Sequence, residues 1–125
     1  LREGNDLTIL AHGITVGEAL GAAAILEKKG VSAAVVNFPT IKPLDCAAVE
    51  AAAKRGPIFV AEDHSTVGGL GGAIAEYTAE YCPQKVKKMG IPDEFGKSGS
   101  ASELLHYYGL SAEKIAMTVL KEVKA

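Results

Sequence analysis

Residues 7–13 read LTILAHG, and the architecture of the chain can be worked out from them. The run has the length of a β-strand, and its lack of polar alternation is typical of a strand that is covered on both faces. Gly13 ends the run, and from residue 15 to residue 29 apolar residues recur at helical spacing until Gly30. This strand–turn–helix unit predicts a parallel sheet with helices packed on its faces.

The same unit recurs along the rest of the chain. Strand–helix alternation at this spacing implies right-handed crossovers and therefore a three-layer α/β/α sandwich around a mainly parallel sheet of four to five strands. We expect one domain over residues 1–125 and, because the chain begins with Leu1 and not Met, a piece of a longer polypeptide. Further strands are predicted at 31–38, 57–61 and 86–91, and further helices at 45–55, 70–82, 100–108 and 111–123.

Local signals mark several helix ends. Thr15 and Glu18 have the spacing of a capping box, in which each side chain satisfies a free amide at a helix start. Asp45 is expected to cap the second helix. Gly17 and Gly21 lie one turn apart and predict a close approach between the first helix and its neighbour.

Composition excludes several classes of protein. The chain is 48% hydrophobic and 22% charged, with a net charge of −2, so nothing attracts nucleic acid or an anionic membrane. No apolar run approaches the roughly 20 residues of a membrane-spanning helix, and residues 1–4 lack the apolar region of a secretory signal. Cys46 and Cys82 lack metal-ligand spacing, so we expect two buried thiols in a cytoplasmic protein and no zinc.

Candidate site residues gather where two predicted strands end. In an open parallel sheet, ligands favour the carboxyl ends of the strands at the point where the winding direction reverses. If the first strand is central, that point lies between His12-Gly13 and Glu62–His64. His64, flanked by Glu62 and Asp63, could act as an acid, a base or a ligand. We favour a loop histidine that bonds locally or lines a contact with another domain, because no nucleophile or metal set accompanies it.

The sequence GGLGG at residues 68–72 raises the question of anion binding. Free amides at a helix start attract anions, so Gly68, Gly69 and Gly71 are candidate ligand residues. The spacing matches neither the dinucleotide fingerprint nor the P-loop. We therefore favour a tight turn that lets the helix start close to the sheet, with a small anion or nucleotide as the alternative.

Two other features bear on contacts with ligands or neighbouring domains. Lys85, Lys87 and Lys88 form a basic run in a predicted strand, where a solvated edge is favoured over a binding patch. Phe95 is an apolar residue among the turn residues of the loop at 92–99. Its ring either folds back on its own domain or is received by a neighbouring one.

Taken together, the motifs resemble the C-terminal domain of transketolase, in the same order and along nearly the whole chain. The resemblance is strong because the fragments succeed one another colinearly, although each one alone is weak. The segments that carry it are residues 1–13, NFPTIKPLD at 37–45, AEDHS at 61–65, GGLGGA at 68–73, GIPDEFGKSG at 90–99, ELL at 103–105 and YGL at 108–110.

The resemblance implies a fold and an activity of a whole enzyme. The fold is a five-stranded mixed sheet whose antiparallel edge strand precedes Leu1, so that here the strand is missing or reduced to a stub. The activity is two-carbon ketol transfer between sugar phosphates, as in the pentose phosphate pathway, with thiamine diphosphate and a divalent metal such as Mg²⁺. In the family, the groups that hold and activate the cofactor belong to the preceding domains. We therefore expect no catalytic, cofactor-binding or metal-binding residue in this chain.

The resemblance also implies a role in assembly. The domain is expected to pack on the cofactor-binding domains or subunit of the same enzyme and to support a homodimer, with Phe95 and His64 near such contacts. Deoxyxylulose-phosphate synthase is the nearest alternative, and FGKSG at 95–99 favours transketolase over it. A 2-oxo-acid dehydrogenase beta subunit and a regulatory module are further alternatives, and a self-contained enzyme that uses His64 is the weakest.

Overall fold

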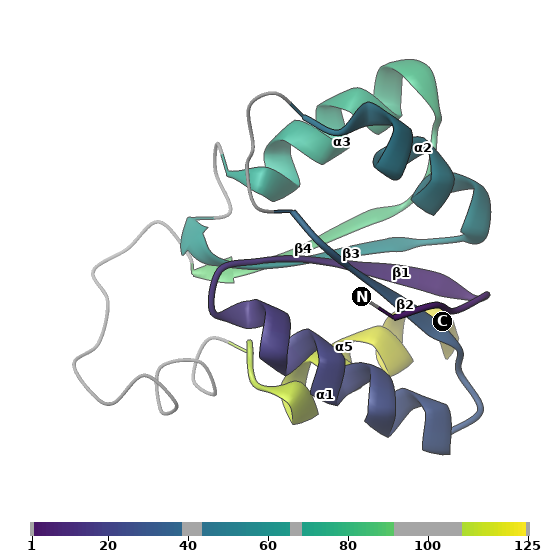
Figure 1. Cartoon of the computed structure of the whole chain (residues 1–125), viewed down its shortest axis with the longest axis vertical. Helices are drawn as coiled ribbons and strands as arrows, with labels where there is room; N and C mark the ends of the chain where they lie inside the picture. The colour runs from purple at the N-terminus through teal and green to yellow at the C-terminus, as the bar shows by residue number, and fades with distance from the viewer. Residues whose placement is uncertain (1, 39–43, 66–68, 92–108, 125) are drawn as a thin grey trace.

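The computed structural model describes residues 2–38, 44–65, 69–91 and 109–124, apart from the side chains of residues 63–65, 91 and 124. In this part of the chain, four parallel strands form one sheet in the order β2-β1-β3-β4. Figure 1 shows α2 and α3 on one face of the sheet and α1 and α5 on the other, which confirms the three-layer α/β/α prediction. The strands are β1 (Leu7–His12), β2 (Ala33–Asn37), β3 (Ile58–Ser65) and β4 (Val86–Ile91), and the helices are α1 (Thr15–Lys28), α2 (Cys46–Arg55), α3 (Leu70–Tyr81) and α5 (Ala112–Lys124).

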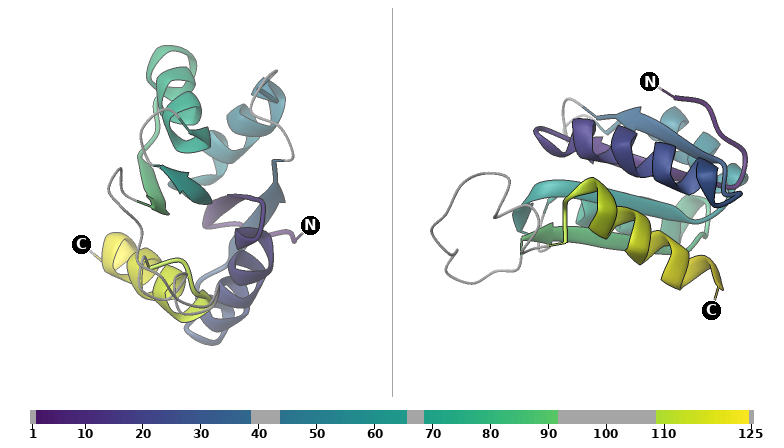
Figure 2. Two further views of the ribbon diagram at one scale, coloured as in Figure 1. Left: turned by 90° about the vertical axis from the view of Figure 1, so that its left-hand side faces the viewer. Right: turned by 90° about the horizontal axis from the view of Figure 1, so that it is seen from below.

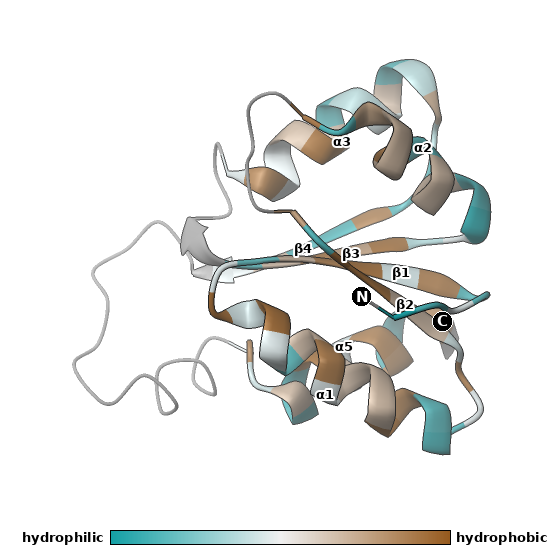
Figure 3. Ribbon diagram, viewed as in Figure 1, coloured by the Kyte–Doolittle hydropathy of each residue, from teal (hydrophilic) through white to brown (hydrophobic). Residues whose placement is uncertain are grey.

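The core consists of two apolar layers, one on each side of the sheet. Successive side chains of β1 alternate between them, with Leu7 and Ile9 in the layer under α1 and α5 and Leu10 in the layer under α2 and α3. Because both faces are covered, β1 needs apolar residues at consecutive positions, as its unbroken run predicted. Figure 3 shows the apolar residues concentrated on the strands and on the sides of the helices that face them.

The edge of the sheet beside β2 is covered by the N-terminal segment. Arg2 forms an isolated antiparallel bridge with Val35, with N–H···O distances of 3.2 and 2.9 Å. Gly4 follows, and a Cβ there would lie 2.3 Å from the carbonyl carbon of Ala33, so only glycine fits this approach. The bridge corresponds to the stub of an antiparallel edge strand that the resemblance implied.

The predicted capping box of α1 is wrong. The helix begins at Thr15, and its N-cap residue, Ile14, provides no side-chain hydrogen bond. The Thr15 hydroxyl is fully buried and lies 2.7 Å from the carbonyl oxygens of both His12 and Ala61. This side chain joins the ends of β1 and β3, because a buried hydroxyl must find its partner where the packing places one.

Two other local predictions are confirmed and one is not. The Asp45 carboxylate accepts a hydrogen bond of 3.1 Å from the Ala48 amide and caps α2. A Cβ on Gly21 would lie 2.9 Å from that of Ala112, so this glycine permits the close packing of α1 on α5. Gly17 has no neighbour within 4 Å of such an atom and does not contribute to the contact.

Cys46 and Cys82 are free thiols that are only partly buried, whereas the sequence predicted two buried ones. Cys46 is the first residue of α2, and Cys82 is the C-cap residue of α3. Within the described ranges, no group of three or more His, Cys, Asp and Glu side chains is placed to hold a metal ion. None of the described helices is both long enough and apolar enough to cross a membrane.

Candidate functional site

The predicted switch point exists. β1 lies between β2 and β3, and His12 is the register partner of Glu62 at the carboxyl ends of the two central strands. Gly13 follows with a φ of 71°, a conformation that favours glycine at this turn. Placing β1 centrally therefore brings His12, Gly13 and Glu62 to one edge of the sheet, as the sequence predicted.

Some of the other predicted site residues lie in the part of the chain that the structure describes, and the rest lie outside it. Gly69 and Gly71 lie at the start of α3, whereas Gly68, Phe95 and the side chain of His64 lie outside the described residues. The backbone of His64 belongs to β3, because this strand continues to Ser65, which pairs with Ile91 after a register irregularity. The prediction that His64 stands in a loop is therefore wrong.

Glu62 is the central residue of this edge. Its side chain is buried, with only 2% of the residue exposed. Its two carboxylate oxygens accept hydrogen bonds from the amides of Leu70 and Gly71, at 2.8 and 3.0 Å. The N-cap residue of α3, Gly69, has no side chain to offer, so Glu62 caps the helix from the neighbouring strand. A carboxylate at this position also interacts favourably with the positive end of the helix dipole.

The Glu62 contact involves the glycine cluster at residues 68–72, which was considered above for anion binding. Two amides at the α3 start, where a small anion was the alternative to the favoured tight turn, donate to a carboxylate of the chain itself. A Cβ on Gly71 would lie 2.7 Å from the Lys88 Cγ, so the glycine lets α3 begin close to β4. The sequence could have indicated the cap, since a helix that starts with glycines needs an acceptor from elsewhere.

His12 takes part in the same edge through its ring. The Nδ1 atom lies 2.5 Å from the carbonyl oxygen of Phe38, just beyond the end of β2. A carbonyl oxygen only accepts, so Nδ1 carries a proton and donates this hydrogen bond. The ring thereby ties β1 to the segment after β2. With the Thr15 and Glu62 contacts, it forms a polar network that holds three strand ends and the start of α3 together.

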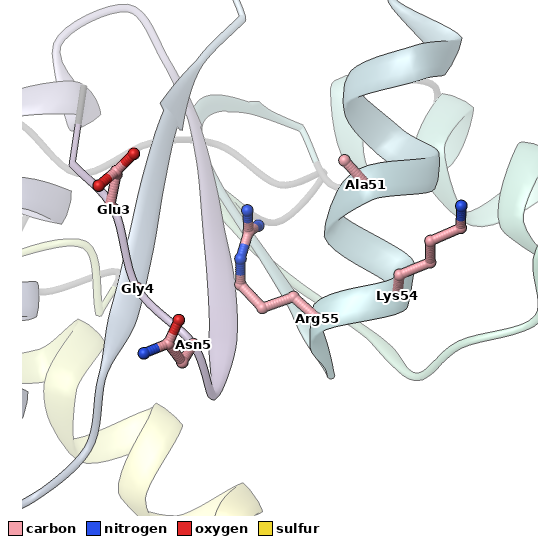
Figure 4. Close-up of a pocket in the computed structure, with 6 residues that line it drawn as sticks. All are labelled: Glu3, Gly4, Asn5, Ala51, Lys54 and Arg55. Carbon is pink, nitrogen blue, oxygen red and sulfur yellow. The ribbon is translucent and has the colours of Figure 1, made fainter.

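A hollow of about 530 Å³ lies at the opposite, amino end of the sheet. Figure 4 shows Arg55 extending from the end of α2 toward the strands, while Lys54 points away. The Arg55 guanidinium donates a hydrogen bond of 2.5 Å to the hydroxyl of the fully buried Thr8. Cations in the last turn of a helix interact favourably with its dipole, so a structural role accounts for both residues. The hollow is lined by Glu3, Gly4, Asn5, Ala51, Lys54 and Arg55.

A third polar group lies between α2 and α3. The Tyr77 hydroxyl donates a hydrogen bond to Glu50, and this bond, with burial and the nearby Cys46, raises the pKa of Tyr77 above its ordinary value. Burial, together with the charges of Glu50 and Cys46, raises the pKa of the Cys82 thiol. Cys82 therefore stays protonated near neutral pH, which does not favour a nucleophile.

Comparison with known proteins shows the family. Residues 1–115 match the family described as transketolase, C-terminal domain. The chain belongs to this family. Its sequence is 49% identical, over 127 residues, to the putative transketolase C-terminal section of Methanocaldococcus jannaschii, a match that covers 99% of this chain and 39% of that protein. It is 44% identical, over 118 residues, to 1-deoxy-D-xylulose-5-phosphate synthase of Heliobacterium modesticaldum, covering 93% of this chain and 18% of the synthase.

Solved structures of this family have the same fold. A structure described as split gene transketolase, inactive beta4 tetramer, matches with a TM-score of 0.90 and 42% identity over 96% of this chain and 40% of that one. A transketolase mutant, R525L, from Pichia stipitis matches with a TM-score of 0.70 and 26% identity over 97% of this chain and 17% of that one. This transketolase C-terminal domain thus spans less than half of the length of the relatives it matches.

Proposed function

We propose that this chain is the C-terminal, assembly-forming section of a thiamine-diphosphate-dependent transketolase and that it does not catalyse ketol transfer alone. The observation that carries the proposal is the use of the switch-point edge. There, Glu62 caps α3, and Thr15 and His12 join strand ends, so polar groups of this edge, including the possible ligand residues His12 and Glu62, form contacts within the fold.

The cofactor belongs to the rest of the enzyme in this proposal. Thiamine diphosphate with its divalent metal supplies the carbanion chemistry that carries a two-carbon unit. Two observations on the described residues support this part of the proposal: no set of three acidic, His or Cys side chains is placed for the metal, and the amides of the α3 start are already bonded to Glu62. No step of the reaction is therefore assigned to this chain.

The partner in this proposal is the cofactor-binding section of the same enzyme, in the cytoplasm, with the complete units forming a homodimer. The split gene transketolase described as an inactive beta4 tetramer supports the need for a partner section, because its description names one kind of subunit and calls the assembly inactive. The length of the relatives also supports a partner section, since this chain corresponds to only 39% of the M. jannaschii relative and to only 40% of the split gene transketolase chain.

Reconstitution tests the proposal. Ketol transfer between sugar phosphates is measured for this chain alone, for the cofactor-binding section alone and for the mixture, each with thiamine diphosphate and Mg²⁺. We expect turnover only in the mixture. Equal turnover by this chain alone would refute the non-catalytic role, and a mixture that forms a complex but remains inactive would refute the assignment to transketolase.

A second candidate is the C-terminal region of 1-deoxy-D-xylulose-5-phosphate synthase. The 44% identity to the synthase of H. modesticaldum favours it, although the chain makes up only 18% of that protein. The same mixtures distinguish the two, because formation of 1-deoxy-D-xylulose 5-phosphate without ketol exchange between sugar phosphates supports the synthase.

A further inference from the structure

A hollow of about 290 Å³ lies between β4 and α5, away from the switch-point edge. In both views of Figure 2, α5 covers the part of the sheet near β4, whereas α1 covers the part near β1 and β2. The lining residues used below are Lys87 from β4 and Lys114, Met117, Thr118, Lys121 and Glu122 from α5.

The α5 residues share one face of the helix. Their separations from Lys114 are three, four, seven and eight positions, which places all five on one side. Ile115 and Val119, which lie on an adjoining part of the helix surface, are buried in the core. The lining face lies outside the apolar core, and it leaves Met117 61% exposed.

The hollow is positively charged in a chain whose net charge is −2. Three lysines and one glutamate line it, which leaves two positive charges in excess. Glu122 is already engaged, at 2.5 Å from Lys85 Nζ and 3.8 Å from Lys87 Nζ. The hydrogen bond from Lys85, followed by the charges of both lysines, holds the pKa of the Glu122 carboxyl below its ordinary value, so it stays ionised and paired.

Two of the lysines lack such a partner. Among the described residues, neither Lys114 nor Lys121 forms an ion pair. Like charges that line one small hollow repel each other, and a bound anion removes that cost. The sequence interpretation of a solvated edge suits Lys85, but Lys87 also forms a wall of the hollow together with residues that are distant in sequence.

We propose that this hollow binds the phosphate monoester of a small metabolite. Lys114 and Lys121 contact the phosphate oxygens, and Lys87 adds a third cation. The Thr118 hydroxyl and the Glu122 carboxylate face the hydroxyl groups of the ligand, and Met117 covers its carbon chain. The volume suits a molecule of a few carbon atoms, at the lower end of small-ligand pockets. This site stands independently of the proposed function.

Calorimetry on the complete protein that carries this chain tests the site. The probes are glycerol 3-phosphate, inorganic phosphate and glycerol, and the variants are Lys114→Ala, Lys121→Ala and, as a matched control, Lys54→Ala at the end of α2. We expect glycerol 3-phosphate to bind more tightly than inorganic phosphate and glycerol not to bind. Each α5 variant is expected to weaken binding by about tenfold, the scale of one lost hydrogen bond between charged groups, and Lys54→Ala is expected to leave it unchanged.

Lysine labelling gives an independent readout on the unmodified protein. Glycerol 3-phosphate should protect Lys114 and Lys121, but not Lys54, from acetylation, as measured by mass spectrometry. Three results would overturn the proposal: no binding of either phosphate at millimolar concentration, inorganic phosphate binding as tightly as the ester, or binding that both α5 variants retain. Loss of ketol transfer in the reconstituted enzyme is not needed for any of these outcomes, so this test and that of the proposed function fail separately.

Discussion

Replacing Glu62 by Gln tests the contact on which the switch-point edge depends. The amide side chain has nearly the same shape, but it keeps one acceptor oxygen and places an NH₂ group where the second oxygen was. Leu70 and Gly71 each donate to a different oxygen, so one of their amides loses its acceptor and faces another donor.

The expected cost follows from the geometry. A buried donor left without its charged partner costs about 1–3 kcal/mol, and the lost interaction with the helix dipole adds about 0.5–1 kcal/mol. We therefore expect the free energy of unfolding to fall by about 3 kcal/mol, a large part of the roughly 5–15 kcal/mol of an ordinary domain.

Urea unfolding followed by circular dichroism measures this loss. With a slope of about 1–3 kcal/mol per molar urea, the midpoint should fall by more than about 1 M, with the slope unchanged. Glu76→Gln is the matched control, since Glu76 is an exposed residue of the same helix, and it should stay within about 0.5 kcal/mol of the parent. A Glu62→Gln midpoint equal to that of the control would refute the assignment of Glu62 as the cap of α3.

Three further predictions concern other parts of the molecule. Gly4→Ala should lower the thermal midpoint, because the added Cβ would lie 2.3 Å from the backbone of the neighbouring strand, at a cost of about 1–3 kcal/mol in the free energy of unfolding. Gly17→Ala, where the added Cβ has open space, should raise the thermal midpoint, because alanine has the higher helix propensity, worth up to about 1 kcal/mol. In a spectrophotometric titration, Tyr77 should ionise above the ordinary pH range of a tyrosine, and Glu50→Gln should bring it back toward that range. An unchanged titration curve would contradict the hydrogen bond. Because the folded-state pKa of Glu122 is lowered, its ion pairs contribute stability that is present above the unfolded-state pKa and is lost as the pH falls through the folded-state pKa. Glu122→Gln should therefore flatten the acid limb of a profile of stability against pH. An unchanged limb would argue against the ion pairs.

The candidate site could be predicted in part. The switch-point edge follows from the order of the strands, and the sequence placed His12 and Glu62 there because β1 was expected at the centre of the sheet. The task of Glu62 was not predicted. The glycines at the start of α3 indicate that an acceptor must come from elsewhere, but the choice of Glu62, a residue of β3 eight positions before Leu70, depends on how α3 docks on the sheet.

Thr15 is a second residue whose hydrogen-bond partner the sequence did not indicate. Its spacing to Glu18 is that of a capping box, yet its hydroxyl meets the carbonyl of Ala61, a residue 46 positions away. The three lysines of the hollow are a further case, since Lys87 and Lys114 are 27 positions apart and only the packing of α5 beside β4 brings them together.

Within the described residues, the amino-acid sequence alone indicated where strands and helices form and that the sheet is parallel and covered on both faces, and it showed which family the chain resembles. The helix predicted at 100–108 lies outside those residues. These properties follow from apolar periodicity and from short motifs, and both are local. Only the tertiary structure decided which buried polar group meets which partner, namely Glu62 with the amides of α3 and Thr15 with β3. A buried polar group must be satisfied by whatever the packing places within about 3 Å, and that neighbour is set by register and helix docking, which are not local.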